Sequence, residues 1–306
     1  MRNDKKHSFR RLKQVLFSIL VGLIVVDVLL LVTQGRDMPV LNTHGLIADQ
    51  QRNLIILTTA LGLLIVVPVF IMLFSIAWRY RASNTKAKYQ PDFETHRGFE
   101  ALWWGIPCVI IIILGVITVV STHALDPYKP IDSQVKPVNV QVVSLNWKWL
   151  FIYPDQQIAT VNYLNIPKDT PINLTLTSDA TMNSFWVPAL AGQVYAMSGM
   201  STQLHLIANG TGSYHGSSAN ISGDGFADMT FKVNSMNETD FVAWAKKSAT
   251  TSDTLTSAKY DTISKPSHDT AQATYKLTGT NLYNEIINKY TAPTNDGSTA
   301  RTGMSQ

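Results

Sequence analysis

The 306-residue chain has a single cysteine, Cys108, and it lies inside an apolar run. One cysteine excludes a disulfide within the chain. Runs of Lys and Arg interleaved with aromatic residues are typical of nucleic-acid binding. The sequence after residue 120 contains no such run. No internal repeat is visible. A disulfide-stabilised domain, a nucleic-acid partner and a repeat array are therefore not expected.

Charge is unevenly distributed along the chain. Residues 1–120 hold 13 of the 25 basic side chains and 7 of the 21 acidic ones, whereas residues 121–306 hold 12 and 14. The excess of positive charge in the net charge of +4 therefore lies in the first third of the chain. Positive charge next to apolar runs is typical of membrane proteins.

Three long apolar runs occupy this first third, over 15–33, 54–78 and 101–120. At about 1.5 Å per residue, each is long enough to cross the roughly 30 Å hydrocarbon core of a bilayer. The second and third runs carry no charged residue. We expect these two to form a transmembrane helical hairpin over residues 45–125.

The loops predict the orientation of the hairpin. Six basic side chains lie in residues 1–14, five in residues 79–100 and two in residues 34–53. Because basic loops stay on the cytoplasmic side, the 79–100 loop is predicted inside and residues 121–306 outside.

The first run, within an N-terminal segment 1–35, has two interpretations. A basic region before an apolar stretch is typical of a secretion signal, and a weak small-residue cleavage pattern lies at 33–35. The run is long for a signal and could be a retained anchor helix, in which case Asp27 should face protein rather than lipid.

The sequence after His123 changes to a period of two. Alternating stretches at 137–143, 171–177, 202–208 and 229–233 are separated by Gly- and Pro-rich turns, which predicts an all-β sandwich over 135–235. Stretches 241–249 and 281–290 look like short helices. We therefore expect residues 236–306 to be a short helical and partly disordered extension.

Two stretches of the sandwich could carry chemistry. GSYHGSSANISGDGFADMTFKV (212–233) places a histidine and a methionine among small residues, as in a copper pocket. NWKWLFIYP (146–154) is dense in aromatics, and a strand would put Trp147 and Trp149 on one face with Lys148 on the other. This stretch is either core or interfacial belt, or a docking surface for a membrane partner.

Together these elements resemble subunit II of the haem–copper respiratory oxidases over roughly residues 45–235. The detailed sequence of the motifs resembles the quinol-oxidising branch of that family, the cytochrome bo-type ubiquinol oxidases. The matching stretches include WRYRASN (78–84), FEALWWGIP (99–107), STHALDP (121–127), WKWLFIYPDQQIATVN (147–162) and MNSFWVPALAGQVYAMSGM (182–200). The resemblance implies a membrane-anchored hairpin followed by a cupredoxin-like sandwich. It also implies a multi-pass protein of the bacterial inner membrane with its large domain in the periplasm.

In the cytochrome c-oxidising branch this domain holds a binuclear copper centre. The resemblance carries its six ligand positions onto Asn183, Ser218, Asn220, Ser222, Phe226 and Met229. Only the methionine keeps a ligand type, and a copper pair needs bridging thiolates. We therefore expect no metal, no cofactor and no catalytic residue on this chain.

Met229 and two histidines of the sandwich have ordinary interpretations. His215 is interpreted as a solvated loop histidine, Met229 as a core residue, and His205 as a residue of a polar strand face.

The resemblance also implies a function. The chain would be subunit II of a proton-pumping oxidase that oxidises ubiquinol and reduces dioxygen to water, with haems and copper on subunit I and no use of cytochrome c. It would cap subunit I, contact it through Trp147 and Trp149, and assemble with other small oxidase subunits. Glu100 in FEALWW matches a glutamate associated with cytoplasmic proton uptake.

Two alternatives come from other classes. One is a membrane-tethered cupredoxin that carries electrons itself, which lacks its ligands here. The other is a membrane-tethered assembly or binding module without an oxidase partner. The chain also has no lipobox cysteine between residues 20 and 50, which leaves lipid anchoring unsupported.

Overall fold

The computed structural model describes residues 38–87, 96–268, 270–279 and 281–291. The first apolar run, Asp27, the cleavage pattern and the last residues of the predicted C-terminal extension lie outside these ranges. The described chain divides into two units: one contains Asn53–Ser121, and the other contains Pro39–Arg52 together with the chain from Thr122 onward.

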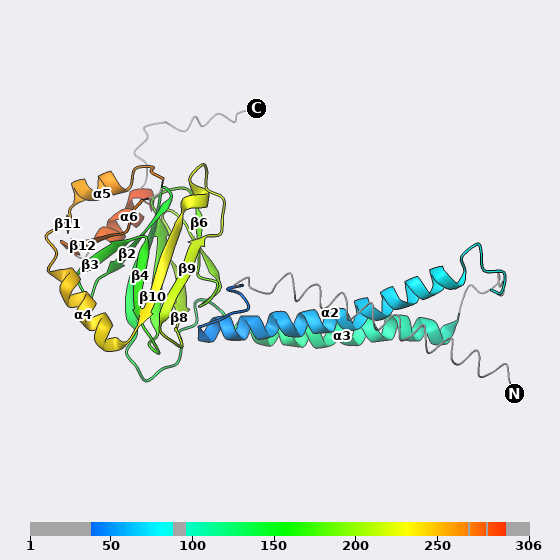
Figure 1. Cartoon of the computed structure of the whole chain (residues 1–306). Coiled ribbons are helices and arrows are strands. Elements are labelled where there is room, and N and C mark those ends of the chain that lie inside the picture. Colours follow the sequence, from blue (N-terminus) through cyan, green and yellow to red (C-terminus); the bar gives the residue numbers. More distant parts are fainter. Residues whose placement is uncertain (1–37, 88–95, 269, 280, 292–306) are drawn as a thin grey trace, which may run out of the picture. The chain divides into compact units, whose positions relative to one another are not determined.

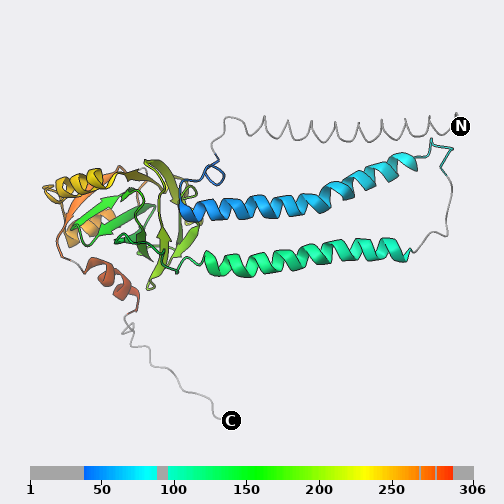
Figure 2. The ribbon, with the colours of Figure 1, turned by 90° about the horizontal axis from the view of Figure 1, so that it is seen from below.

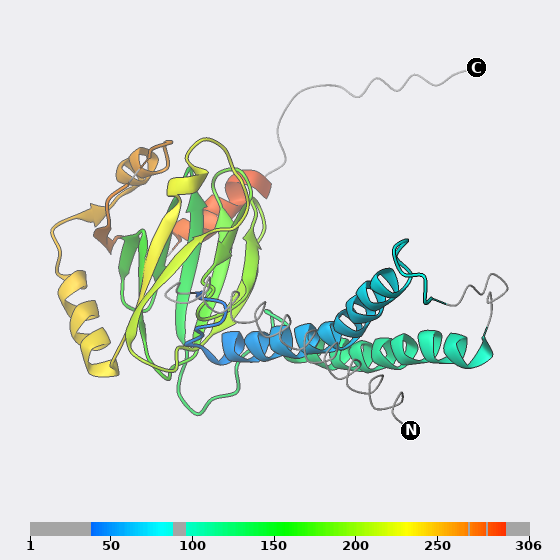
Figure 3. The ribbon, with the colours of Figure 1, turned by 45° about the vertical axis from the view of Figure 1, so that its right-hand side comes forward.

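Two long helices, α2 (Leu46–Arg79) and α3 (Arg97–Ala124), contain the second and third apolar runs. Both are long and apolar enough to cross a membrane. Large side chains such as Phe74 and Ile112 are 65% and 67% exposed, which suits contact with lipid or a partner helix. Figures 2 and 3 show α2 bending along its length, and Pro68 inside it cannot donate a helical hydrogen bond.

The second unit is a sandwich of two β-sheets (Figure 1). The seven-stranded sheet has the order β11-β12-β3-β2-β1-β5-β8, and the five-stranded sheet has the order β4-β10-β9-β6-β7. The first six strands are β1 (Val138–Leu145), β2 (Lys148–Tyr153), β3 (Ile158–Val161), β4 (Tyr163–Pro167), β5 (Ile172–Ser178) and β6 (Asn183–Trp186). The other six are β7 (Gln193–Ala196), β8 (Thr202–Leu206), β9 (Gly212–Ser218), β10 (Thr230–Met236), β11 (Thr254–Leu255) and β12 (Ala273–Leu277).

Most neighbouring strands are antiparallel, as in β1–β2, where Val142 lies opposite Phe151. The pairs β1–β5, β4–β10 and β11–β12 are parallel. The predicted sandwich is therefore confirmed, and its four alternating stretches correspond to β1, β5, β8 and β10.

Strand β2 is buried on both of its faces. One face, with Trp149 and Phe151, belongs to the core between the two sheets. The other face, with Leu150 and Ile152, belongs to a second core on the outside of the seven-stranded sheet. This double burial explains why the sequence of β2 is continuously apolar and aromatic.

The C-terminal region closes the second core. Helices α4 (Glu238–Ala249), α5 (Ser257–Ile263) and α6 (Leu282–Thr291) surround one side of the sandwich in Figure 1. Tyr260, Tyr283 and Ile286 are buried there against the outer face of the sheet. The predicted helices after residue 236 are present, but the described part of this extension also contains two strands that the sequence did not predict, because β12 pairs with β3 and β11 pairs with β12.

The start of α2 belongs to the sandwich unit. Leu46 N donates to Ile207 O at 3.3 Å, and Ala48 N donates to Leu190 O at 3.3 Å. A Cβ on Gly45 would lie 2.4 Å from Leu190 O, so this close backbone contact requires glycine. Ala48 is 2% exposed. The first turn of the helix is thus anchored by main-chain bonds to the residue after β8 and to the turn between β6 and β7.

Candidate functional site

The six positions onto which the resemblance carries the copper ligands, called the former copper positions below, lie around one end of the five-stranded sheet. Asn183 begins β6 and Ser218 ends β9. Asn220 and Ser222 follow in the loop, Phe226 begins the 3-10 helix η1 (Phe226–Asp228), and Met229 precedes β10. Tertiary structure therefore brings together residues that are up to 46 positions apart in the sequence.

Hydrogen bonds among polar side chains fill the centre of this site. The Ser218 hydroxyl donates to Asn183 Oδ1 at 2.9 Å. Asn183 Nδ2 donates to Ser144 Oγ at 2.8 Å and to Thr181 O at 2.9 Å. Asn183, Ser218 and Ser144 are 1%, 5% and 0% exposed. The buried polar groups thus satisfy one another, as buried polar groups must.

The outer positions are also occupied by the protein's own contacts. Asn220 Nδ2 donates to Met182 O at 3.0 Å. Met229 is fully buried in the core between the sheets, which confirms its interpretation as a core residue. Phe226 is half-buried, and its ring has no donor atom for a metal.

The residues at these positions do not fit a copper pair. Two amides, two hydroxyls, a phenyl ring and one thioether replace the imidazole, carboxyl and thiolate ligands, and neutral hydroxyls cannot bridge two copper ions as thiolates do. Among the described residues, no group of three or more His, Cys, Asp or Glu side chains is arranged to hold a metal. Cys108, the only thiol of the chain, lies in α3.

Trp147 occupies a turn between β1 and β2 rather than a strand. Its φ is +62°, a left-handed conformation that is rare for a bulky residue. The indole Nε1 donates to Ser222 O at 3.4 Å, and its ring lies 5.0 Å from that of His268. A Cβ on Gly225 would lie 2.4 Å from the indole. Trp147 is therefore enclosed between the former copper loop and the C-terminal region.

Trp147 lies in the turn before β2, but both tryptophans pack against the core between the two sheets, as the alternation predicted. Trp149 is 0% exposed and packs edge-on against Phe185 and Phe231, at 5.3 and 5.8 Å between ring centroids. The expectation that Trp149 contacts another subunit is wrong for this reason: its side chain presents no surface. The opposite direction of Lys148 is confirmed, since its ammonium reaches the C-terminal region.

A C-terminal segment, Ile263–His268, crosses over the Trp147 turn; we call it the strap. Lys148 is 1% exposed, and its Nζ donates to Ile263 O at 2.9 Å and to Lys265 O at 2.6 Å. Asn146 Nδ2 donates to Ser264 O at 3.1 Å. Burial lowers the pKa of the Lys148 ammonium. The sequence analysis missed the strap, although a lysine between two tryptophans was a sign of a buried cation.

A buried carboxylate fixes the helices on either side of the strap. Asp179 accepts from Tyr260 OH at 2.6 Å, Tyr290 OH at 2.6 Å and Lys289 Nζ at 2.7 Å. Burial by itself raises the pKa of Asp179, but the three hydrogen bonds and the lysine charge outweigh it, so that the pKa is lowered overall. Asp179 N also donates to Ser144 O at 2.8 Å, which links this carboxylate to the former copper site.

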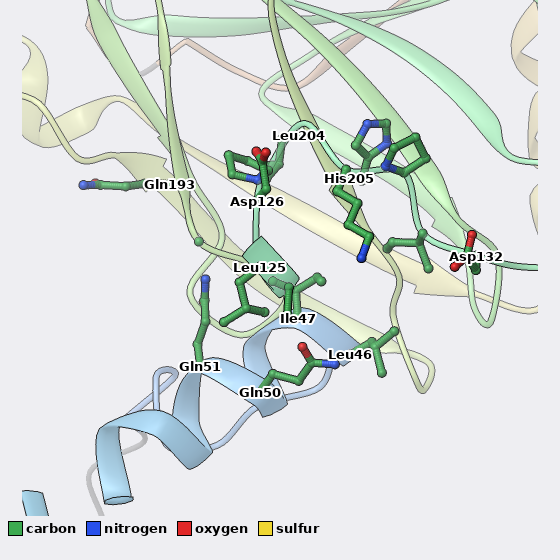
Figure 4. Close-up of a pocket in the computed structure, with 16 residues that line it drawn as sticks. Leu46, Ile47, Gln50, Gln51, Leu125, Asp126, Asp132, Gln193, Leu204 and His205 are labelled. Carbon is green, nitrogen blue, oxygen red and sulfur yellow. The ribbon is translucent and has the colours of Figure 1, made fainter. Parts of the chain in front are cut away.

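The structure places both histidines on strands. His215 is exposed as expected, but it lies in β9 opposite Lys232 rather than in a loop. His205 faces away from Leu204 and Leu206 along β8, yet it is only 8% exposed. Its interpretation as a residue of the polar strand face is confirmed, since Nδ1 lies 2.8 Å from Oδ1 of Asn173 on the neighbouring strand. Together with the start of α2 and the chain after α3, it lines the cavity shown in Figure 4.

Glu100 lies in the first turn of α3, and its side chain is exposed. Its backbone N donates to His96 O at 3.0 Å. The described structure therefore leaves the carboxylate open to solvent or to a partner, and it lies far along the chain from the former copper positions.

Comparison with known proteins identifies the sequence families. Residues 154–236 match the family of the cytochrome c oxidase subunit II periplasmic domain, and residues 250–294 match the COX aromatic-rich motif. The second match covers the strap and α6.

Relatives match most of the chain. Cytochrome bo(3) ubiquinol oxidase subunit 2 of Pseudomonas aeruginosa is 49% identical over 84% of this chain and 77% of its own. Ubiquinol oxidase subunit 2 of Acetobacter aceti is 42% identical over 85% of each chain. A solved structure, the periplasmic domain of subunit II of cytochrome oxidase (CoxB) of Bradyrhizobium japonicum, is 17% identical with a TM-score of 0.37 and covers 39% of this chain and 96% of that chain. By its sequence relatives, which confirm the resemblance to the quinol branch, this membrane-anchored chain belongs to the ubiquinol oxidase subunit 2 family.

Proposed function

We propose that this chain is the non-redox subunit II of a proton-pumping ubiquinol oxidase, in which subunit I carries the haems and copper. The observation that supports this most is the closed hydrogen-bond network of Asn183, Ser218 and Ser144, where a copper relay would need thiolates. Ubiquinol dissolves in the bilayer, so it can reduce a haem in the membrane directly and needs no relay in the sandwich.

A second observation supports the same conclusion. In the cytochrome c-oxidising branch, the tryptophan matching Trp147 guides electrons from copper. Here His268 of the strap lies against that side chain, with 5.0 Å between the ring centroids. We infer that Trp147 has a structural role, including contact of its turn with subunit I, and that cytochrome c is not a donor.

The location follows from charge and relatives. The basic connection between the two helices supports a cytoplasmic loop, and the sandwich then lies in the periplasm of a bacterial inner membrane. Glu100 begins α3 next to that loop. A solvent-accessible carboxylate at this place can collect cytoplasmic protons and pass them to a channel in subunit I.

Purification of the intact complex in mild detergent tests the proposal. We expect a haem-bearing subunit to co-purify and ubiquinol to sustain oxygen uptake, whereas reduced cytochrome c does not. A haem-free chain purified alone would instead support a binding or assembly module. An electron paramagnetic resonance signal from a copper pair in the sandwich would contradict a non-redox subunit.

A further inference from the structure

A histidine caps the start of α3. The backbone N–H of Glu100 donates to His96 O at 3.0 Å, and the backbone N–H of Phe99 donates to the side-chain Nδ1 of His96 at 3.3 Å. A residue whose carbonyl accepts the first helical bond and whose side chain accepts a second N–H is an N-cap. His96 therefore satisfies backbone N–H groups that have no partner within the helix.

Packing also holds the imidazole against this first turn. The centroid of the His96 ring lies 4.6 Å from that of Phe99. A Cβ on Gly98 would lie 3.2 Å from His96 Cε1, so the glycine leaves room for the ring. His96 and Glu100 are both exposed, so both side chains can exchange protons with the solvent.

A histidine cap depends on the protonation of its ring. Nδ1 accepts the N–H of Phe99 only while it carries no proton, in the neutral imidazole that has its proton on Nε2. Histidine is the side chain that changes charge between about pH 5 and 8. A positive charge is also unfavourable at the N-terminus of a helix, because of the helix dipole. Protonation of His96 therefore removes the cap.

The charged residues of the first turn of α3 are Arg97 and Glu100. Arg97 follows His96 directly, and its charge repels a protonated imidazole. Glu100 is four residues after His96, a spacing that places two side chains side by side on a helix surface. Protonation thus takes the Phe99 N–H away from the ring and offers it a carboxylate as a new partner.

We propose that His96 is a proton-sensitive cap that controls access to Glu100. The neutral imidazole holds the first turn of α3 and leaves the carboxylate open to solvent. The protonated imidazole releases the turn and pairs with the carboxylate, so that proton uptake slows at low cytoplasmic pH. His96 is a positioning residue in this account, which rests on the proposed role of Glu100.

Amide hydrogen exchange of the intact complex tests the cap. Exchange of the peptide that contains residues 97–102 is measured at about pH 5.5 and about pH 7.5, near the two ends of the range in which histidine changes charge. His96→Asn keeps an N-cap acceptor that does not titrate, whereas His96→Ala has no acceptor. Comparison of the variants at the same pH cancels the intrinsic pH dependence of exchange.

At the higher pH we expect the unsubstituted chain and His96→Asn to exchange alike, and His96→Ala to exchange about fivefold faster, the ratio expected for a lost N-cap. At the lower pH the unsubstituted chain should exchange as fast as His96→Ala, while His96→Asn stays slow. His215→Asn replaces an exposed histidine of β9 and is the control, which should follow the unsubstituted chain.

Equal exchange in the unsubstituted chain and His96→Asn at both pH values would overturn the proposal. Equal exchange in His96→Ala and His96→Asn would do the same, and if His96→Ala does not assemble, His96→Asn decides alone. Ubiquinol-dependent oxygen uptake should fall more steeply toward low pH in the unsubstituted complex than in His96→Asn, and coinciding profiles would overturn the control of Glu100. The exchange measurement needs no turnover, so it distinguishes a failure of the cap from a failure of the proposed oxidase function.

Discussion

At the scale of single residues, Asn183 and Ser218 replace two metal ligands and bond to each other and to Ser144, whereas the Ser222 hydroxyl is buried without a hydrogen bond in the described part of the chain. Asn183 donates to Ser144 and accepts from Ser218, so the amide uses both of its ends. Restoring one cysteine at Ser218 would break this network and would still supply a single thiolate. The loss of copper is thus stabilised by replacement bonds rather than by an empty space.

Asp179 carries a prediction about stability. Asp179→Asn should lower the free energy of unfolding by about 2 kcal/mol at pH 7, because a buried charge-assisted hydrogen bond to Lys289 is lost. The folded-state pKa of Asp179 is lowered, so its stabilisation is present above the ordinary carboxyl pKa of about 3.9 and disappears as pH falls through the folded pKa. The deficit of the variant should therefore shrink below about pH 4.

Denaturant unfolding of the detergent-solubilised chain, followed by tryptophan fluorescence at pH 7 and pH 3, measures this effect. The exposed Asp253→Asn is the matched control. An Asp179→Asn variant as stable as the control at pH 7 would show that the charge-assisted bond to Lys289 contributes nothing.

Glu100 carries a prediction about turnover. Glu100→Ala should slow ubiquinol-dependent oxygen uptake, because a proton-collecting carboxylate is lost at the start of α3. Assembly and haem content should not change, since the side chain is exposed. The exposed Glu238→Ala in α4 is the control. Unchanged turnover of Glu100→Ala across the pH range would remove this residue from proton uptake.

At the scale of elements, the C-terminal region is integral to the sandwich. β12 extends the seven-stranded sheet beside β3, and Tyr283 and Ile286 of α6 bury its outer face. The second core makes β2 a central strand covered on both sides. Deletion of this region would therefore expose an apolar face of the seven-stranded sheet, which removal of an unpacked C-terminal segment would not do.

Lys148 tests how the strap is held. Lys148→Met keeps most of the side-chain volume but removes the donor to Ile263 O and Lys265 O. Amide hydrogen exchange in Ile263–His268 should become faster by about tenfold, in line with the loss of about 1.5 kcal/mol of hydrogen bonding, while β1 and β5 keep their protection. Mass spectrometry of the whole chain reports this.

Lys276→Met is the control for the strap, because Lys276 is exposed in β12. If exchange in the strap is the same in Lys148→Met and in the control, the buried ammonium does not hold this segment.

At the scale of the whole molecule, the two units have opposite requirements. The helices expose apolar side chains along their length, which need lipid or partner helices. The sandwich buries its apolar side chains in two cores of its own. The chain therefore needs a membrane for its helices and an aqueous compartment for its sandwich. This agrees with its membership of an oxidase subunit family.

Much of this protein could be predicted from local sequence. Uncharged apolar runs specify α2 and α3, and period-two alternation specifies β1, β5, β8 and β10, because one face of each strand meets a core. The sequence also shows that the sandwich has no cysteine to supply thiolates. The poor fit to a copper pair could therefore be predicted without the structure. These features depend on residues that are close together in the chain or on residues that are absent.

Only the tertiary structure determined the surroundings of Trp147, Lys148, Trp149 and His205, because these surroundings depend on contacts between distant segments. Trp149 became a core residue and Trp147 a turn residue through a left-handed backbone that no periodicity predicts. Lys148 meets the carbonyls of Ile263 and Lys265 more than one hundred positions away. His205 is buried because two distant segments cover its strand face. Alternation tells which way a side chain points, whereas only the folded chain determines what lies there.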